Sequence, residues 1–145
     1  MALIRKDAKV TALRRSPLFE GLSGKQLGHL ARLAEDLEMP TGTVLCKEGQ
    51  RGREFFVIIE GEAAVTRGGR RIATVRAGEF FGEIALLVSV NRTATVTALT
   101  PVRFFVISDG AFKSMLDTDR VIERTVLLTL ARRVLSNTGD PTPAS

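Results

Sequence analysis

Apolar residues recur at helical spacing in the first quarter of the chain. The positions that form this stripe are Val10, Leu13, Leu27, Leu30, Leu33, Ala34 and Leu37. Such spacing is typical of amphipathic helices that bury one face. The segment "SPLFEGLS" interrupts the stripe, because Pro17 and Gly21 break a helix and Ser23 can cap the next one. We therefore predict helices over residues 6–37.

Short runs of β-branched and aromatic residues replace this pattern from residue 38 to residue 108. "EFFVIIEGEAAVTRGGRRIATV" splits at Gly61 and at a Gly-Gly pair, and "TATVTALTPVRFFVIS" splits near Pro101. Runs of about five to seven residues, with glycine-bearing turns every eight to twelve or so, are typical of an antiparallel barrel or jelly roll. We predict a mainly β fold with flanking helices, in which residues 38–108 form an antiparallel jelly roll (a double-stranded β-helix).

Helical spacing returns at Asp109. "DGAFKSMLD" predicts a short helix, and a longer helix follows to residue 137. The apolar side predicted for the longer helix consists of Val121, Ile122, Val126, Leu127, Leu130, Ala131 and Val134. Residues 138–145 form a polar tail that we expect to be disordered. The order is therefore helices, β-roll and two C-terminal helices (109–137), in one domain over residues 1–137.

Two isolated charges stand in the apolar stretch "FFGEIALLVSVNRTATV", residues 80–96. They are Glu83 and Arg92. Burying an unpaired charge costs several kcal/mol, on the order of the whole stability margin of a small domain. A segment inside the β-roll is therefore expected to carry these charges for a purpose.

The local sequence around these charges allows two interpretations. Gly82 frees the backbone, so that residues 83–87 can form one turn of helix whose first N–H groups suit an anion. Arg92 has a planar fork of donors that matches phosphate oxygens, and Glu83 can accept hydrogen bonds from a hydroxyl, as carboxylates do from ribose. Glu83 and Arg92 therefore form either a structural ion pair that closes the loop or a site for the phosphate and sugar of a nucleotide.

Composition and charge restrict the classes of partner. The 145 residues are 44% hydrophobic, which fits a single globular domain. The net charge of +5, from 21 basic and 16 acidic residues, favours an anionic partner or reflects arginine on solvated faces. The chain has no Trp and no Tyr, which argues against a stacking platform for single-stranded nucleic acid. No membrane-length apolar run and no secretory signal are present, so a cytoplasmic location is expected.

The scarcity of histidine and cysteine excludes much of enzyme chemistry. Metal-dependent hydrolases and cupin-type oxygenases use several histidines, whereas His29 is alone and lies in a helical pattern. Cys46 is also alone, so it forms no internal disulfide, and it is expected to be a small buried hydrophobe. The chain has no "GK[ST]" nucleotide loop. We expect no catalytic residue, no metal site and no cofactor.

The central stretch resembles the phosphate-binding cassette of the cyclic nucleotide-binding domain. This domain occurs in bacterial catabolite activator proteins, kinase regulatory subunits and cyclic-nucleotide-gated channels. "FGEIAL" at 81–86 and "RTATV" at 92–96 follow the family pattern, and "EGQRGREFFVIIEGEAAV" is similar to its first hairpins. The helix–roll–helix order extends the resemblance over about residues 10–136. The chain is thus identified as a stand-alone bacterial member of this family.

The resemblance assigns roles to individual residues of the cassette. It implies that Glu83 binds the ribose 2′-hydroxyl and that Arg92 pairs with the exocyclic phosphate oxygens. The full set of ligand-binding residues that it implies is Gly82, Glu83, Ile84, Ala85, Arg92, Thr93 and Ala94. The residue at Thr93 leaves cAMP and cGMP open, with cAMP favoured.

In the family the last helix usually caps the base of the ligand. The candidates for this role are Val126, Leu127, Leu130, Arg132 and Arg133. The alternative for each of them is plain packing on the β-roll.

The expected function is binding of cAMP or cGMP by a small, non-enzymatic, stand-alone signalling domain. Ligand would order the cassette and the C-terminal helix and change the surface shown to an effector or a second subunit. The alternatives are a dimerisation or adaptor module that has kept the fold and, least favoured, an enzyme such as a phosphodiesterase. A DNA-reading module of two further helices would not fit after Asn137, and no transmembrane segment precedes the domain. Direct DNA binding and membrane insertion are therefore not expected. Met1 and the polar tail favour a natural small protein, for which a homodimer stays open.

Overall fold

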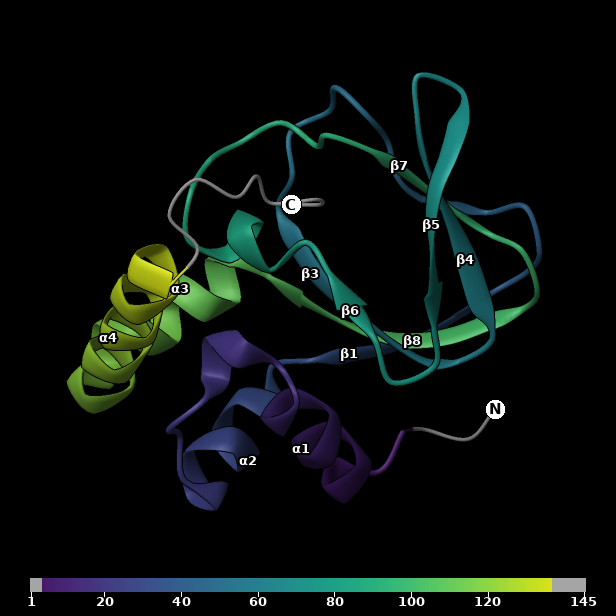
Figure 1. Ribbon diagram of the computed structural model, residues 1–145. Coiled ribbons are helices and arrows are strands. Elements are labelled where there is room, and N and C mark those ends of the chain that lie inside the picture. The colour runs from purple at the N-terminus through teal and green to yellow at the C-terminus, as the bar shows by residue number, and fades with distance from the viewer. Residues whose placement is uncertain (1–3, 137–145) are drawn as a thin grey trace.

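The computed structural model describes residues 4–136, without the side chains of Pro17, Glu83, Leu130, Arg133, Val134 and Ser136. Eight strands form two antiparallel four-stranded sheets, of order β1-β8-β3-β6 and β2-β7-β4-β5 (Figure 1). The strands are β1 Glu35–Met39, β2 Val44–Cys46, β3 Glu54–Glu60, β4 Glu62–Arg67, β5 Arg70–Arg76, β6 Phe80–Phe81, β7 Thr95–Ala98 and β8 Val102–Ser108. The predicted mainly β jelly roll with flanking helices is confirmed.

Helices lie at both ends of the chain and cover one side of the roll. Helices α1 and α2 lie next to β1, and α3 and α4 lie beside them (Figure 1). The helices are α1 Lys6–Arg14, α2 Gly24–Arg32, α3 Asp109–Thr118 and α4 Arg120–Ser136, with 3₁₀ turns η1 Pro17–Phe19 and η2 Glu83–Leu86. None of the helices in residues 4–136 is long and apolar enough to span a membrane.

Two hydrophobic cores share the strands β3 and β8. Successive side chains of a strand point to opposite faces of a sheet. Phe55 and Phe105 accordingly lie in the core between the roll and the helices, whereas Phe56 and Phe104 lie in the core inside the roll. The paired phenylalanines of the sequence therefore hold the helices on one face and close the roll on the other.

The N-terminal helices follow the sequence signals except at their end. Ser23 forms a capping box with Gln26 at the start of α2, as predicted. The predicted helical region, however, extends too far, because α2 ends at Arg32. Leu37 pairs with Phe104 of β8 and packs against the core of the roll, so it belongs to β1. Pairing with a strand distant in the sequence overrides the helical spacing of this leucine.

The C-terminal helices begin where the sequence predicts. Strand β8 ends at Ser108, and its hydroxyl accepts a hydrogen bond from the Ala111 N–H at 3.2 Å and caps α3. The loop between β7 and β8 contains Pro101, also as predicted. The predicted disordered tail at 138–145 lies outside the described residues.

The predicted apolar side of α4 is partly wrong. Ile122 and Val126 are fully buried, but Val121 and Leu127 are 63% and 58% exposed. The buried stripe continues to Thr129, whose hydroxyl donates to the Glu20 carbonyl at 3.2 Å. Helix α4 packs on α3 and η1, and among its described side chains a narrow stripe of Ile122, Val126 and Thr129 is buried. Ala131 is also exposed, and the side chains of Leu130 and Val134 are not described.

A largely buried ion pair fastens α1 to the roll. The ammonium group of Lys9 lies 2.8 Å from the carboxylate of Asp36 in β1 and also donates to the Ala34 carbonyl at 3.1 Å. The other carboxylate oxygen of Asp36 accepts from the Ile4 N–H at 3.1 Å. About nine tenths of each charged side chain is buried. Loss of one partner would leave the other charge uncompensated.

We expect Asp36→Ala to lower the free energy of unfolding by about 2 to 4 kcal/mol, because Lys9 stays buried without its counter-ion. The measurement is urea unfolding followed by circular dichroism. The control is Asp7→Ala, since the pair between Asp7 and Arg5 is exposed and contributes under about 0.5 kcal/mol. Equal unfolding midpoints for the two variants would contradict this role of Asp36.

Candidate functional site

A tight turn at Gly82 begins the candidate site. Strand β6 ends there, and Gly82 has a φ of 83°, a left-handed conformation that glycine adopts without a steric penalty. The next residues form η2, in which the Ala85 N–H donates to the Gly82 carbonyl at 3.1 Å. The predicted single helical turn after the glycine is confirmed.

The loop between β2 and β3 fixes the main chain of the second half of the cassette. The Gly52 N–H donates to the Val90 carbonyl at 3.0 Å, and the Arg92 N–H donates to the Gln50 carbonyl at 2.7 Å. The Arg92 carbonyl in turn accepts from the Gly49 N–H at 2.9 Å. These three bonds leave the backbone at Arg92 little freedom.

The side chain of Arg92 turns inward and lies beneath the Gly82 turn. Only 5% of this residue is exposed. Its Nη2 donates to the Glu54 carbonyl at 2.7 Å, and its guanidinium lies 5.8 Å from the centre of the Phe56 ring. Its Nη1 is buried and has no hydrogen-bond partner. The structure thus holds a cation at the inner end of the cassette with one donor group unused.

Two glycines make room for this guanidinium. A Cβ atom at Gly52 would lie 2.8 Å from Nε of Arg92, and one at Gly82 would lie 2.5 Å from its Nη1. Both distances are shorter than real Cβ contacts allow, so any side chain at either glycine would displace Arg92. Gly52 and Gly82 therefore form a slot that positions the guanidinium.

The environment of Arg92 favours an anionic ligand. Among the side chains that the structure describes, no carboxylate lies within ion-pair distance of Arg92. A buried cation without a counter-ion, with an unpaired N–H group, is costly for the free protein. An anion with two acceptor oxygens would supply both the charge and the missing hydrogen bond.

The residues after Arg92 are held from the side by two other elements. The Thr93 carbonyl accepts a hydrogen bond from Nε of Arg67 in β4 at 2.9 Å, and the hydroxyl of Thr95 accepts from the Glu48 N–H at 3.0 Å. Thr93 itself is exposed, whereas Ala94 is buried. The Thr93 side chain is therefore available to a ligand on a fixed backbone.

The structure brings the two halves of the predicted site together. Gly82 and Arg92 are in contact, Ile84 is half-buried and Ala85 is buried. The Ala85 N–H is already used by the Gly82 carbonyl, which limits what it can offer a ligand. The Glu83 side chain lies outside the described part of the structure. Its predicted roles, on a ribose hydroxyl or in an ion pair with Arg92, both stay predictions.

Sequence reasoning missed the residues that position Arg92. Nothing in the local sequence distinguishes Gly52, the Glu54 carbonyl, the Phe56 ring and Arg67 as parts of the site. The spacing of these residues carries no signal, because each reaches Arg92 or Thr93 from another strand or loop. The one hint that the sequence offers is that Gly52 lies shortly before strand β3, whose apolar run begins at Phe55.

The single histidine and the single cysteine of the sequence, His29 and Cys46, both lie in the described part of the structure. His29 is half-exposed on α2, as predicted, and Cys46 is half-buried with its Sγ 3.9 Å from the Ala94 carbonyl. Burial raises the pKa of the Cys46 thiol, and the nearby charge of Arg92 opposes this rise. No group of three or more His, Cys, Asp or Glu among the described side chains could hold a metal ion.

The candidates for a base cap on α4 are not equivalent. Val126 is buried in the helix-side core and is not available to a ligand. Leu127 and Arg132 are exposed, and the side chains of Leu130 and Arg133 are not described.

Turn η2 touches α3, and Leu86 at its end is fully buried in the same core as Phe112 of α3. The cassette is therefore packed directly against α3, which in turn packs against α4.

A family model described as "cyclic nucleotide-binding domain" matches residues 37–119. The chain is 32% identical over 102 residues to the cGMP-dependent protein kinase egl-4 of Caenorhabditis elegans, covering 70% of this chain and 13% of that protein. It is 33% identical over 106 residues to the cAMP-dependent protein kinase regulatory subunit of Yarrowia lipolytica, covering 72% and 28%. The chain thus spans less than a third of the curated relatives that it matches here.

Solved structures show the same similarity. The N-terminal domain of a transcriptional regulator from Streptomyces coelicolor A3(2) superposes with a TM-score of 0.81 at 30% identity, covering 90% of this chain and 97% of that one. The regulatory domain of Toxoplasma gondii PKA, solved with cAMP, superposes with a TM-score of 0.70 at 28% identity, covering 75% and 43%.

Proposed function

Because the chain belongs to the cyclic nucleotide-binding domain family, we propose that it binds a cyclic nucleotide at the Gly82–Ala94 cassette and acts as a non-enzymatic regulatory domain. One observation carries the proposal. The Arg92 guanidinium is buried, lacks a described counter-ion and keeps one Nη1 group without a partner. A cyclic phosphate has one negative charge and two exocyclic oxygens, which fit this need.

The other cassette residues complete the ligand site in this proposal. Glu83 accepts a hydrogen bond from the ribose 2′-hydroxyl, and the main chain of Gly82, Ile84 and Ala85 surrounds the sugar and phosphate. Thr93 and Ala94 contact the phosphate and the base. Support comes from the geometry of the turn, which places Gly82 against Arg92, and from the exposure of Thr93.

Binding is coupled to the C-terminal helices in this proposal. Because η2 packs on α3 and shares the core of α4, a shift of the cassette changes the position of both helices. Leu127 and Arg132 are the exposed α4 residues able to close over the base. The domain then serves as a cytoplasmic, stand-alone signalling module that shows its effector a different surface with and without ligand, without itself binding DNA.

A dimerisation or adaptor module is the second candidate function. The exposed apolar residues of α4 favour it, namely Val121, Leu127, Leu128 and Leu135. It differs from the leading proposal in that no ligand would be needed. The buried, unpaired Nη1 group of Arg92 counts against it, because a module without a ligand gains nothing from this group.

We expect Arg92→Ala to weaken cyclic nucleotide binding at least tenfold, since charge-assisted hydrogen bonds contribute about 1.5–3 kcal/mol. Calorimetric titration measures the affinity, and circular dichroism checks the fold. Gly52→Ala is expected to weaken binding as well, because the new methyl group displaces the guanidinium. Arg14→Ala removes an exposed charge on α1 and is the matched control. Unchanged affinity in folded Arg92→Ala protein would reject the assignment.

We expect cAMP to bind more tightly than cGMP, which is the choice that the family resemblance at Thr93 favours. Competition of the two nucleotides for one site, followed by calorimetry or by dye-based thermal unfolding, gives the ratio of their affinities. Thr93→Ala is expected to lower cGMP affinity more than cAMP affinity, because a hydroxyl there can bond the guanine base. A preference of wild-type protein for cGMP would contradict the choice of cAMP.

We expect ligand to slow hydrogen exchange in two regions, residues 82–94 and residues 118–136. The first region contacts the ligand and the second closes over it. Exchange measured by mass spectrometry with and without saturating cAMP separates the two effects. Protection confined to the cassette would contradict movement of the C-terminal helix while leaving ligand binding intact.

A further inference from the structure

Strand β5 is an open edge of the roll. It is the last strand of its sheet and pairs only with β4 in the sheet order. Residues 70–73 are all exposed, and Val75 is the one buried residue of the strand. An exposed edge presents main-chain N–H and C=O groups that can pair with another strand.

The direction of hydrogen bonding shows which groups face outward. The Glu62 N–H donates to the Thr100 hydroxyl and the Glu62 carbonyl accepts from the Leu99 N–H, so the main chain of Glu62 points away from β5. Bonding direction alternates along an antiparallel strand. Ala64 therefore also points away from β5, and its partner Thr74 directs its own N–H and C=O to the open edge.

The end of β5 confirms this alternation. Arg76 lies two residues after Thr74, and its N–H donates to the carboxylate of Glu79 at 2.6 Å. A carboxylate already occupies one outward N–H of this edge. Among the described residues, the outward groups of Thr74 have no such partner.

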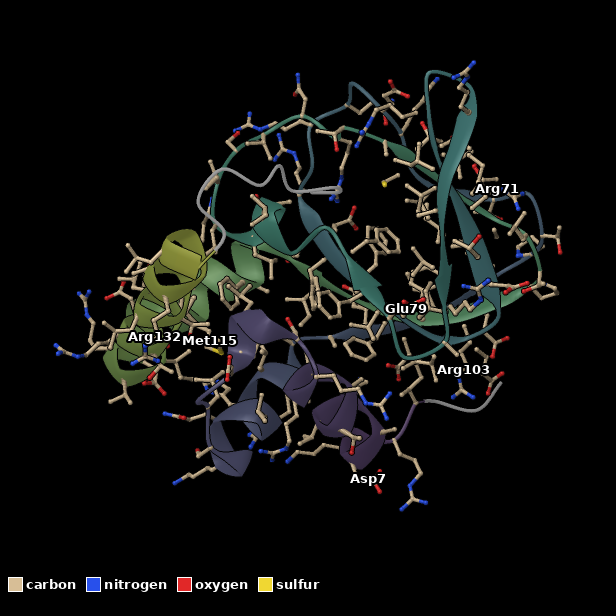
Figure 2. The ribbon with its side chains drawn as sticks, in the orientation of Figure 1. Asp7, Arg71, Glu79, Arg103, Met115 and Arg132 are labelled. Carbon is tan, nitrogen blue, oxygen red and sulfur yellow. The ribbon has the colours of Figure 1, made fainter. Side chains whose placement is uncertain are left out.

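The side chains along this edge are basic and partly apolar. The β4–β5 hairpin, residues 62–76, contains four arginines and one glutamate. Arg76 lies 3.6 Å from Glu62 and Arg67 is bound to Thr93, but no described acidic side chain pairs with Arg70 or Arg71. Arg71 lies on the outer side of the hairpin (Figure 2). The excess of positive charge is thus concentrated where the edge is open.

A bulge places an apolar side chain among these arginines. The register of β4 and β5 shifts between Val65 and Thr66, which leaves Ile72 as the extra residue of β5. Ile72 is 45% exposed. Within the described part of the chain, the edge thus combines the free main-chain groups of Thr74, two arginines without an acidic partner and one exposed isoleucine.

We propose that the β5 edge binds an extended, acidic segment of a partner protein, which adds to the sheet as a further strand. The outward groups of Thr74 pair with its main chain, its carboxylates lie on Arg70 and Arg71, and an apolar side chain packs on Ile72. Strand addition draws affinity from main-chain bonds and specificity from alternate side chains. The proposal concerns a surface distinct from the cassette and does not depend on nucleotide binding.

Other occupants match this edge less well. A second copy paired through β5 would bring the arginines of both copies, Arg70, Arg71 and Arg76, together on one short edge, and like charges brought close together are destabilising. A nucleic acid would use the arginines but would leave the outward main-chain groups of Thr74 and the side chain of Ile72 without a match. An acidic peptide strand satisfies all three features together.

The test uses a fluorescein-labelled nine-residue peptide of alternating glutamate and valine. We expect it to bind the full-length protein in fluorescence anisotropy and to slow hydrogen exchange at the Thr74 amide, measured by nuclear magnetic resonance. A peptide with lysine in place of glutamate is expected to bind at least tenfold more weakly. Failure of the acidic peptide to bind would overturn the proposal, and the arginines would then only protect the edge.

Two sets of variants separate strand addition from plain charge attraction. We expect the double variant Arg70→Glu, Arg71→Glu to bind the peptide at least tenfold more weakly. The control is the double variant Arg14→Glu, Lys25→Glu, which makes the same charge change at exposed helical positions and should change the affinity by less than about threefold. Thr74→Pro removes an outward N–H without breaking the ladder to β4, and it should also abolish binding, while Thr74→Val should not. Unchanged binding in Thr74→Pro, or tighter binding of a single-stranded oligonucleotide than of the peptide, would overturn the proposal.

Discussion

The buried guanidinium of Arg92 is the constraint on which the site depends. It is held by the Glu54 carbonyl, by the Phe56 ring and by two glycines that leave no room for a side chain. The protein carries the desolvation cost of this cation in the free state and leaves one donor group unpaired. A ligand that brings its own negative charge therefore meets a donor already fixed in place, which reduces the ordering cost of binding.

The same strands that hold Arg92 also connect it to the helices. Phe56 faces the roll and contacts the arginine, whereas its neighbour Phe55 faces the helical core together with Leu86 of the cassette. Turn η2 touches α3, and α3 packs on α4, so packing contacts connect the cassette to both helices. The alternation of side chains along β3 thus places the charged site and the helix-side core on opposite faces of one strand.

Much of this architecture was predictable from local patterns. The glycine turns, the Ser23 cap and the turn after Gly82 all depend on residues close together in the sequence, and the structure confirms them. The predicted strand length of about five to seven residues holds for five strands, whereas β2, β6 and β7 have only three, two and four residues. The predicted end of the N-terminal helices and the predicted apolar side of α4 were wrong for one shared reason. The helical spacing of Leu37 and Leu127 is genuine, but their burial depends on which distant element lies opposite.

The sequence by itself determined the fold class, the order of elements and the two charges of the cassette, since periodicity and turn residues act over a few positions. Only the tertiary structure decided how Arg92 is held, because Gly52, Glu54 and Phe56 reach it across the roll. It likewise decided that β5 is an open edge, which follows from the pairing of whole strands. The sequence shows which residues are charged, whereas burial and hydrogen-bond direction show which described groups lack a partner inside the protein.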